Sequence, residues 1–273
     1  MRVALRRAAH QLLDHPRVLE DPLAVPIVGD AIDELRTNPA RHQSAIARRF
    51  RAFMVARSRY AEDQLAASVL RGVRQYLILG AGLDTSAYRG VAASGKLRVF
   101  EVDHPHTQAW KQRRLLAANI SVPASVRFVP VDFERQDLAV ELENTGFRAS
   151  QPAFVSWLGV VPYLTKEAAA HMFSLLGHFP ESSGVAFDYA VPPAALGFFE
   201  KMALAALSRR VARIGEPFRL FFTPSELEES LRSFGFRTIE QLTSREINAR
   251  YFEGRTDSLA VTGAAGRLVS AWT

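Results

Sequence analysis

The stretch that decides the fold is RQYLILGAGLDT, residues 74–85. A short apolar run, 76–79, leads into a turn that contains Gly80 and Gly82, and Asp84 follows the turn. A continuous apolar run favours a strand that is covered on both faces, as in a parallel sheet. The two glycines allow a sharp turn and leave room beside the backbone. A strand, a glycine turn and a helix start in this order are typical of α/β proteins that hold an adenosine-bearing cofactor at a strand end.

The segments after this turn alternate between strands and helices. We expect strands at 76–79, 97–102, 126–131, 153–158 and 184–189, and helices from Thr85 and at 107–119, 138–145 and 166–179. We also expect a helix from Thr223 to about Gly235, strands at 236–242 and 259–262, and a last segment, 267–272, that is a strand or a frayed end. This rhythm predicts an α/β fold with a mostly parallel sheet and helices on both of its faces.

We expect the whole chain, residues 1–273, to form a single domain. Residues 1–72 are predicted to be a helical N-terminal cap that ends in a long helix at 41–70, and residues 73–191 the cofactor-binding core. The prolines and the Ala- and Leu-rich helix at 192–222 indicate a lid inserted over the site, after which 223–273 complete the core. In the long helix, Arg57 falls on or beside the apolar stripe, where an arginine requires an anionic partner.

The composition narrows the class of protein. A net charge of +6 raises the question of nucleic acid, but the arginines are dispersed along the chain, so we do not expect nucleic-acid binding. There is no cysteine, which excludes disulfides and thiolate metal sites. The seven histidines show no spacing typical of metal ligation, and we expect no metal. No apolar stretch is long enough to span a membrane, so we expect a cytoplasmic protein.

The glycine turn favours one adenosine cofactor over another. A dinucleotide site uses a third glycine and binds diphosphate at a helix start. Here the third glycine is missing, and Asp84 would place negative charge near that diphosphate. S-adenosyl-L-methionine has no phosphate and carries a sulfonium cation, for which an acid is tolerable. An NAD(P)-dependent oxidoreductase, or a non-catalytic basic binding protein, is the alternative interpretation.

Acids at the ends of the next two strands complete a candidate site. Glu101 and Asp103 end the second strand, about twenty residues past the turn, and Asp103 at its tip is the better candidate to accept both ribose hydroxyls. After the third strand, Asp132 and Phe133 are placed to contact the adenine. The structural alternative for these acids is helix or turn capping. Arg57 can pair with the methionyl carboxylate, or form a structural salt bridge.

With these residues in place, the chain resembles the S-adenosyl-L-methionine-dependent methyltransferases related to leucine carboxyl methyltransferases and polyketide O-methyltransferases, of the actinobacterial type. The matching segments are ARSRYAED from Ala56, LGAGLDTSAYR from Leu79, FEVDHP from Phe100, FVPVDFE from Phe128, FVSWLGVVPYLT from Phe154 and FTPSELEESLRSFGF from Phe222. The resemblance implies a Rossmann-like class I methyltransferase fold. It also implies that Arg57 binds the cofactor carboxylate, Gly80 lines the methionine moiety, Asp103 holds the ribose, and Asp132 with Phe133 flanks the adenine. Several relatives have a glutamate after the tryptophan of the fourth strand, where this chain has Leu158.

The expected reaction is O-methylation of a carboxylate or a hydroxyl on a small molecule. In-line methyl transfer mainly requires alignment of the acceptor, and only a hydroxyl acceptor needs a base. Asp188, Tyr189 and Tyr163 are placed for that role, but a structural capping or core role is the better explanation of each, so we assign no catalytic residue. The apolar residues of the predicted lid are typical of the packed interior of a lid or of a binding site for an apolar acceptor. They are Leu196, Phe198, Phe199, Met202 and Leu204.

Overall fold

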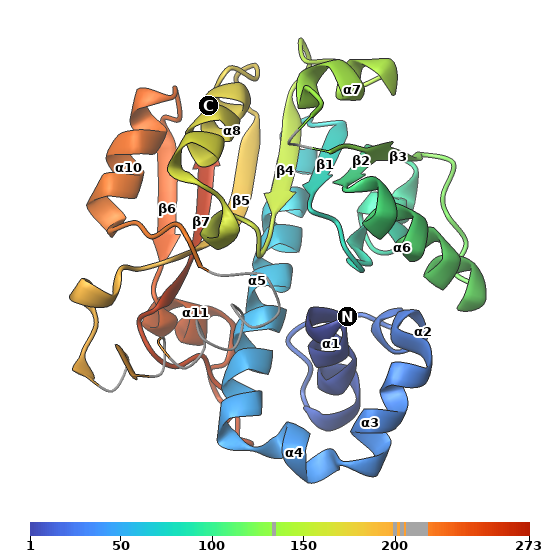
Figure 1. Ribbon diagram of the computed structural model, residues 1–273, viewed down its shortest axis with the longest axis vertical. Coiled ribbons are helices and arrows are strands. Elements are labelled where there is room, and N and C mark those ends of the chain that lie inside the picture. Colours follow the sequence, from blue (N-terminus) through green and yellow to red (C-terminus); the bar gives the residue numbers. More distant parts are fainter. Residues whose placement is uncertain (133–134, 199–200, 203–204, 206–217) are drawn as a thin grey trace.

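The computed structural model describes residues 1–132, 135–198, 201–202, 205 and 218–273. Their strands form one seven-stranded sheet in the order β3-β2-β1-β4-β5-β7-β6 (Figure 1). The strands are β1 (Gln75–Leu79), β2 (Arg98–Asp103), β3 (Val126–Pro130), β4 (Ala153–Trp157), β5 (Gly184–Ala190), β6 (Thr238–Leu242) and β7 (Gly266–Trp272). β1 to β5 pair in parallel, whereas β7 runs antiparallel to β5 and β6. The predicted mostly parallel sheet is confirmed.

The strand order identifies where a ligand crevice is expected. From β1 the chain moves outward through β2 and β3, and then returns to place β4 on the other side of β1. In open α/β sheets a ligand binds beyond the carboxyl ends of the strands at such a reversal. The relevant ends here are those of β1 and β4.

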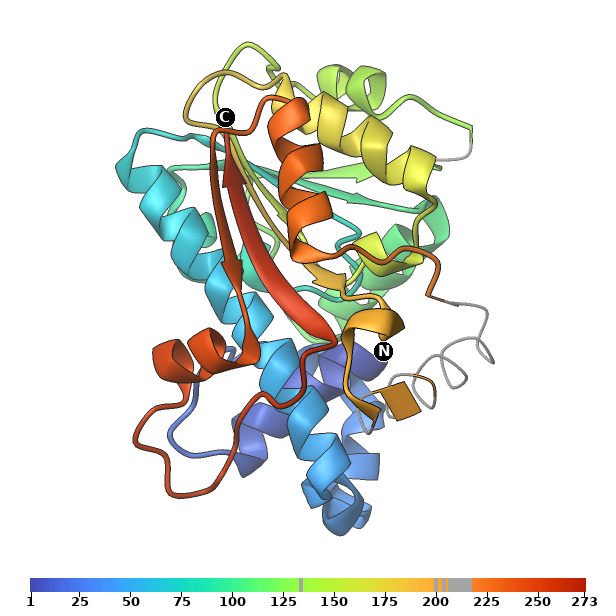
Figure 2. The ribbon, with the colours of Figure 1, turned by 90° about the vertical axis from the view of Figure 1, so that its left-hand side faces the viewer.

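Helices enclose the sheet and form the N-terminal cap. The cap helices are α1 (Arg2–Leu13), α2 (Ala24–Val28), α3 (Ile32–Thr37), α4 (Pro39–Gln43) and α5 (Ala45–Leu70). The later helices are α6 (Pro105–Ala117), α7 (Leu138–Asn144), α8 (Lys166–Gly177), α10 (Pro224–Ser233) and α11 (Ser244–Tyr251). Figures 1 and 2 show α5 running from the cap along one face of the sheet. Among the described residues, no helix is both long and apolar enough to cross a bilayer.

Alternate residues of each strand build two hydrophobic cores. Tyr76 and Ile78 of β1 join the core shared with α1, α2 and α5, whereas Leu77 and Leu79 join the core shared with α7, α8 and α10. This is the period of two that strands impose, with both faces covered. Full burial of one such aliphatic side chain stabilises the fold by roughly 1.5–3 kcal/mol. The expectation of helices on both faces is confirmed.

Two predicted elements are wrong, and one was missed. Instead of a helix from Thr85, the chain forms short 3-10 turns at Ser86–Tyr88 and Ala92–Ser94, because Gly90 lies between them at a positive φ of 57°. Residues 259–262 form no strand. Val261 instead exchanges two hydrogen bonds with the side-chain amide of Asn248, at 2.8 Å each. Asn248 belongs to α11, which the sequence reading missed although Thr243 and Glu246 form a capping box at its start.

The last segment, Arg267–Trp272, is resolved as a strand within β7. The predicted lid, 192–222, falls mostly outside the described residues, because 199–200, 203–204 and 206–217, with Phe199 and Leu204 among them, are not described. In the described part, Pro193–Ala195 form a 3-10 turn, and Phe222 donates its backbone N–H to the Ala190 carbonyl at 3.0 Å. The division into cap, core, lid and C-terminal part stays a prediction.

Candidate functional site

The glycine turn at the end of β1 is a close-packed backbone cradle. Gly80 and Gly82 have φ of +66° and +47°, in the left-handed region that other residues rarely adopt. A Cβ on Gly80 would lie 2.6 Å from Cγ2 of Val160 in the loop after β4. A Cβ on Gly82 would meet no neighbour closer than 3.9 Å, so the backbone is open on that side. At the reversal of strand order, the turn is thus closed by Val160 at Gly80 and open at Gly82.

Asp103 lies at the tip of β2, beside this turn. Its Oδ2 accepts the Gly82 backbone N–H at 2.6 Å, and its Oδ1 accepts the His104 N–H at 2.7 Å. The side chain is half-buried, and a carboxylate retains further lone pairs after two such bonds. The structure therefore brings Asp103 and Gly82 together, and Asp103 also has the capping role that was the structural alternative. Its contact with a ribose stays a prediction.

Glu101, the other acid of this strand, lies two residues before Asp103 on the same face of β2 but contacts other elements. It is fully buried, with its Oε1 2.7 Å from Lys111 Nζ and its Oε2 accepting from the Tyr88 hydroxyl at 2.8 Å. Burial raises the pKa of Glu101, and the Lys111 ammonium opposes that shift. Glu101 is a structural partner of α6, which agrees with the choice of Asp103 from the sequence.

Arg57 comes from the middle of α5 and meets the ends of β4 and β5. Its Nη1 lies 3.0 Å from Oδ2 of Asp188, and Oδ1 of Asp188 accepts the Gly159 N–H at 2.6 Å. The Arg57 and Asp188 side chains are each only 8% exposed, so this is a buried ion pair. The structural salt bridge considered from the sequence is present. Binding of a cofactor carboxylate by Arg57 stays a prediction.

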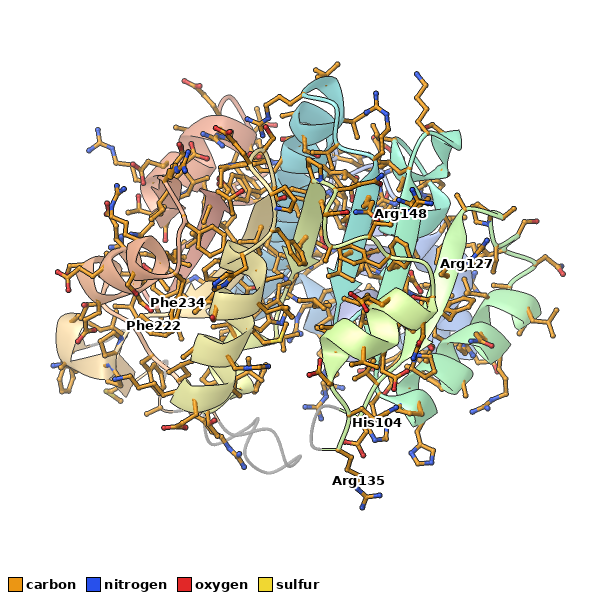
Figure 3. The ribbon with its side chains drawn as sticks, turned by 90° about the horizontal axis from the view of Figure 1, so that it is seen from above. His104, Arg127, Arg135, Arg148, Phe222 and Phe234 are labelled. Carbon is orange, nitrogen blue, oxygen red and sulfur yellow. The ribbon has the colours of Figure 1, made fainter. Side chains whose placement is uncertain are left out.

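Asp132 follows β3 and is engaged in the turn that succeeds it. Its backbone N–H donates to Oε1 of Gln136 at 2.9 Å, and its carboxylate lies 3.7 Å from Nε of Arg135. Figure 3 shows His104 and Arg135, which follow β2 and β3, on the same side of the molecule, away from Arg127 and Arg148. Phe133 lies outside the described residues. The adenine contacts of Asp132 and Phe133 stay predictions.

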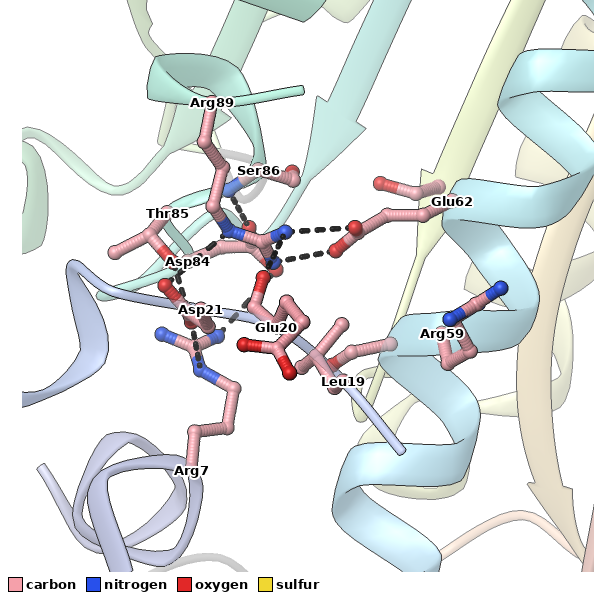
Figure 4. A network of polar contacts seen from close by, with 12 residues as sticks. Arg7, Leu19, Glu20, Asp21, Arg59, Glu62, Asp84, Thr85, Ser86 and Arg89 are labelled. Carbon is pink, nitrogen blue, oxygen red and sulfur yellow. Dashed lines mark hydrogen bonds and ion pairs between the residues drawn. The ribbon is translucent and has the colours of Figure 1, made fainter. Parts of the chain in front are cut away.

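A buried polar network that the sequence reading missed ties the cap to the glycine turn (Figure 4). Arg7 of α1 donates to the Leu83 carbonyl and lies 3.6 Å from Oδ2 of Asp84 and 3.4 Å from Oδ2 of Asp21. Asp21 has no exposed surface and accepts from the Thr85 hydroxyl at 2.7 Å. Burial would raise the pKa of Asp84, but the Arg7 and Lys111 charges and hydrogen bonds from Ser86 lower it overall. Asp84 is therefore an ionised partner of the cap.

Arg89 extends the same network to α5. Its Nε lies 3.2 Å from Oδ1 of Asp21, and its two terminal nitrogens contact the Glu62 carboxylate at 2.7 Å and 2.5 Å. The turn after β1 is thus fixed from α1, from α5 and from the loop that contains Asp21. Among the described residues, His, Asp and Glu form no group of three or more that could hold a metal ion.

Each of the three candidate bases contacts other residues of the chain. Asp188 is held by Arg57 and Gly159 N–H, as described above. The Tyr189 hydroxyl donates to Oε1 of Gln241 at 2.7 Å, and burial raises the pKa of Tyr189 to about 12. The Tyr163 ring lies 5.3 Å from the Phe218 ring. Leu158, which follows Trp157 of β4, is half-buried against the core that contains α5.

Comparisons with known proteins agree with this fold. Residues 1–177 match the family model described as leucine carboxyl methyltransferase. The chain is 32% identical over 279 aligned residues to the putative S-adenosyl-L-methionine-dependent methyltransferase YktD of Bacillus subtilis, covering 94% of this chain and 91% of the relative. A putative S-adenosyl-L-methionine-dependent methyltransferase of Parafrankia is 33% identical over 163 residues, covering 58% of this chain and 51% of the relative.

Solved structures show the same fold at low sequence identity. A putative methyltransferase from Thermobifida fusca has a TM-score of 0.59 at 16% identity, covering 99% of this chain and 94% of the other. Magnesium protoporphyrin IX methyltransferase from Synechocystis, solved with bound S-adenosylhomocysteine, has a TM-score of 0.51 at 14% identity, covering 90% and 97%.

The sheet order, the glycine turn and these comparisons define a class I methyltransferase that depends on S-adenosyl-L-methionine. The chain belongs to the leucine carboxyl methyltransferase family, whose model covers well over half of its length. The NAD(P)-dependent oxidoreductase and the non-catalytic binding protein, considered as alternatives from the sequence, are therefore set aside.

Proposed function

We propose that this protein methylates an oxygen of a small molecule, and that the oxygen belongs to a carboxylate. The observation that carries the choice is the engagement of Asp188 and Tyr189, two of the three residues placed to act as a base. A hydroxyl acceptor must lose a proton during transfer, whereas a carboxylate acceptor is already ionised at neutral pH. Because Asp188 and Tyr189 both have structural partners, the site suits a carboxylate acceptor, which needs no base.

The chain's own residues fit the cofactor that this reaction requires. Gly82 leaves the backbone of the turn open, and the half-buried Asp103 carboxylate retains lone pairs for two ribose hydroxyls. We assign Arg57 to the methionyl carboxylate, and Asp132 with Phe133 to the adenine. S-adenosyl-L-methionine supplies a methyl group on a sulfonium. The protein contributes orientation and the exclusion of water, which are the main requirements of an in-line displacement.

Arg57 has a second effect in this proposal. Because Asp188 is held by both Arg57 and Gly159 N–H, the ion pair fixes the loop after β4 against α5. That loop also contains Val160, which packs on Gly80. In this proposal the acceptor reaches the glycine turn past the loop after β4. The position of that loop depends on the ion pair between Arg57 and Asp188.

The test is transfer of a labelled methyl group, followed by alkaline hydrolysis of the product. The protein is incubated with methyl-tritiated S-adenosyl-L-methionine and panels of small carboxylic acids, phenols and alcohols. A carboxyl methyl ester releases volatile labelled methanol in alkali, whereas a methyl ether does not. Release of volatile label supports the proposal, and alkali-stable label would refute the carboxylate in favour of a hydroxyl acceptor.

Two variants test whether the transfer requires a base. Tyr189→Phe removes the hydroxyl that donates to Gln241 and should retain most of the transfer rate, because no base is required. Asp103→Ala should lose transfer through loss of cofactor binding. If Tyr189→Phe abolished transfer while cofactor binding and folding were unchanged, Tyr189 would be the base, and the carboxylate proposal would be wrong.

A further inference from the structure

The N-terminal cap contains a groove that no part of the assigned cofactor site uses. It has a volume of about 430 Å³, within the range of small-molecule sites. Its walls include Arg2, Leu5 and Arg6 of α1, Arg41 of α4, and Ile46 and Phe50 of α5. We call it the cap groove. Figure 1 shows these three helices next to one another below the strand ends.

The polar lining of the cap groove is strongly biased to positive charge. Four arginines line it, at positions 2, 6, 41 and 51, against a single carboxylate, Glu34. Arg41 lies 2.9 Å from Glu34, and Arg51 is paired with Asp14, which is not in the lining. The net charge of the lining thus favours an anion.

His42 adds a buried polar atom to the same lining. Its Nε2 is buried and makes no hydrogen bond among the described residues, and the nearest carboxylate oxygen, on Glu34, is 3.9 Å away. Burial lowers the pKa of His42, an effect that Glu34 opposes and that Arg41 and Arg51 assist. A buried nitrogen without a partner costs free energy that a ligand hydrogen bond would recover.

Apart from Ser44, the remaining lining is apolar and partly exposed. Leu5 and Ala9 are buried along the wall formed by α1, whereas Ile46 on α5 is 64% exposed. The Arg6 guanidinium lies over the Phe50 ring at 5.2 Å, so positive charge and apolar surface adjoin. Such a surface matches a molecule with an anionic head and an apolar body.

We propose that the cap groove binds an amphipathic anion, with a carboxylate toward Arg2 and Arg6 and a hydrocarbon body along Ile46 and Phe50. The site goes beyond the proposed function, because none of its residues is assigned to the cofactor and its occupancy requires no methyl transfer. It is nevertheless close to that function in space. Phe50 precedes Arg57 by seven residues on α5, which is two turns on the same helix face and about 10 Å along the axis.

The experiment is calorimetry of the full chain, without cofactor, against three probes. Octanoate has both head and body, octanamide has the same body without charge, and acetate has the charge without the body. We expect octanoate to bind about tenfold more tightly than octanamide, as one charge-assisted contact would give. Octanoate should also bind at least about tenfold more tightly than acetate, because burial of only two methylenes already contributes about that factor. Equal affinity for octanoate and octanamide, or no octanoate binding, would overturn the proposal.

Matched variants separate the groove from general surface effects. Arg6→Gln should weaken octanoate about tenfold, whereas Arg237→Gln, an exposed arginine of the segment before β6, should not. Ile46→Ser should weaken it about fivefold, whereas Leu70→Ser, at the other end of α5 and 89% exposed, should not. Because Ile46 is largely exposed, its variant is expected to melt like the wild type. If the two control variants weakened binding as much as the groove variants, octanoate would not be bound in the cap groove.

Discussion

Replacement of Asp103 by alanine tests the assignment of the cofactor site most directly. The variant removes the carboxylate that accepts from Gly82 N–H at 2.6 Å and from His104 N–H at 2.7 Å. Because both donors are near solvent, water can replace part of the loss, and we expect the free energy of unfolding to fall by about 1–3 kcal/mol. The effect on cofactor should be larger. Two ribose hydroxyl bonds to a carboxylate contribute about 3 kcal/mol together, which is about a hundredfold in Kd.

The assay is calorimetry with S-adenosylhomocysteine, alongside urea denaturation. Asp103→Asn keeps one acceptor oxygen and should give an intermediate loss. Asp137→Ala is the matched control, because Asp137 also accepts a helix N-terminal N–H, that of Ala139 at 2.8 Å, but has no predicted cofactor role. An analogue of S-adenosylhomocysteine without the 2′-hydroxyl distinguishes a lost ribose contact from a distorted turn. If Asp103 contacts that hydroxyl, Asp103→Ala should bind the analogue and S-adenosylhomocysteine equally. Wild-type affinity in Asp103→Ala, or undiminished discrimination against the analogue, would refute the reasoning.

Three further predictions concern the cradle, the cap and pH. Gly80→Ala should lose cofactor binding and should lower the free energy of unfolding more than Gly90→Ala does. Both substitutions incur about 1–2 kcal/mol of left-handed strain, but only a Cβ at Gly80 also meets Val160, at 2.6 Å. Equal losses of unfolding free energy in urea denaturation would argue against the contact with Val160. Asp21→Asn should lower the free energy of unfolding by about 3–5 kcal/mol, since it leaves Arg7 and Arg89 without their shared buried carboxylate. The exposed Asp33→Asn should stay within about 0.5 kcal/mol, and a similar loss in both variants would contradict a special role of the network. Burial alone would raise the pKa of Asp14, but hydrogen bonds from His10 and Arg51 lower it from 3.8 to about 2. This depressed pKa stabilises the fold by about 2 kcal/mol above pH 4, and that contribution is lost as the pH falls toward 2. Denaturation midpoints measured from pH 6 to pH 2 should show this loss in the wild type and a smaller one in Asp14→Asn.

The parts of the fold that follow from short segments could be predicted from the sequence. The apolar run before Gly80 and the glycine turn itself are local features, and the structure places them where the pattern indicates. The helix expected from Thr85 failed because Gly90 interrupts it with a positive φ, a conformation that composition alone does not reveal. The capping box of Thr243 and Glu246 was a usable local signal for α11.

The site's electrostatics could be predicted only in outline. The placement of Arg57 on a buried stripe indicated that it needs an anion, but its partner, Asp188, is 131 residues away. Arg7 and Asp84 are similarly far apart in sequence, and nothing local in either segment indicates their pairing. Which acid neutralises which arginine depends on the packing of the cap on the sheet, and that packing is a property of the whole chain.

The length of α5 couples the cap groove to the ends of β4 and β5. One uninterrupted helix of 26 residues bears Arg51 beside the cap groove, Arg57 at the ends of β4 and β5, and Glu62 in contact with Arg89. A rigid rod of about 39 Å cannot shift at one of these points without shifting at the others. With Arg57 assigned to the cofactor as proposed, a ligand that draws the first turns of α5 toward α1 would alter the affinity for S-adenosyl-L-methionine. Thermodynamic linkage then requires the cofactor to alter that ligand's affinity by the same factor.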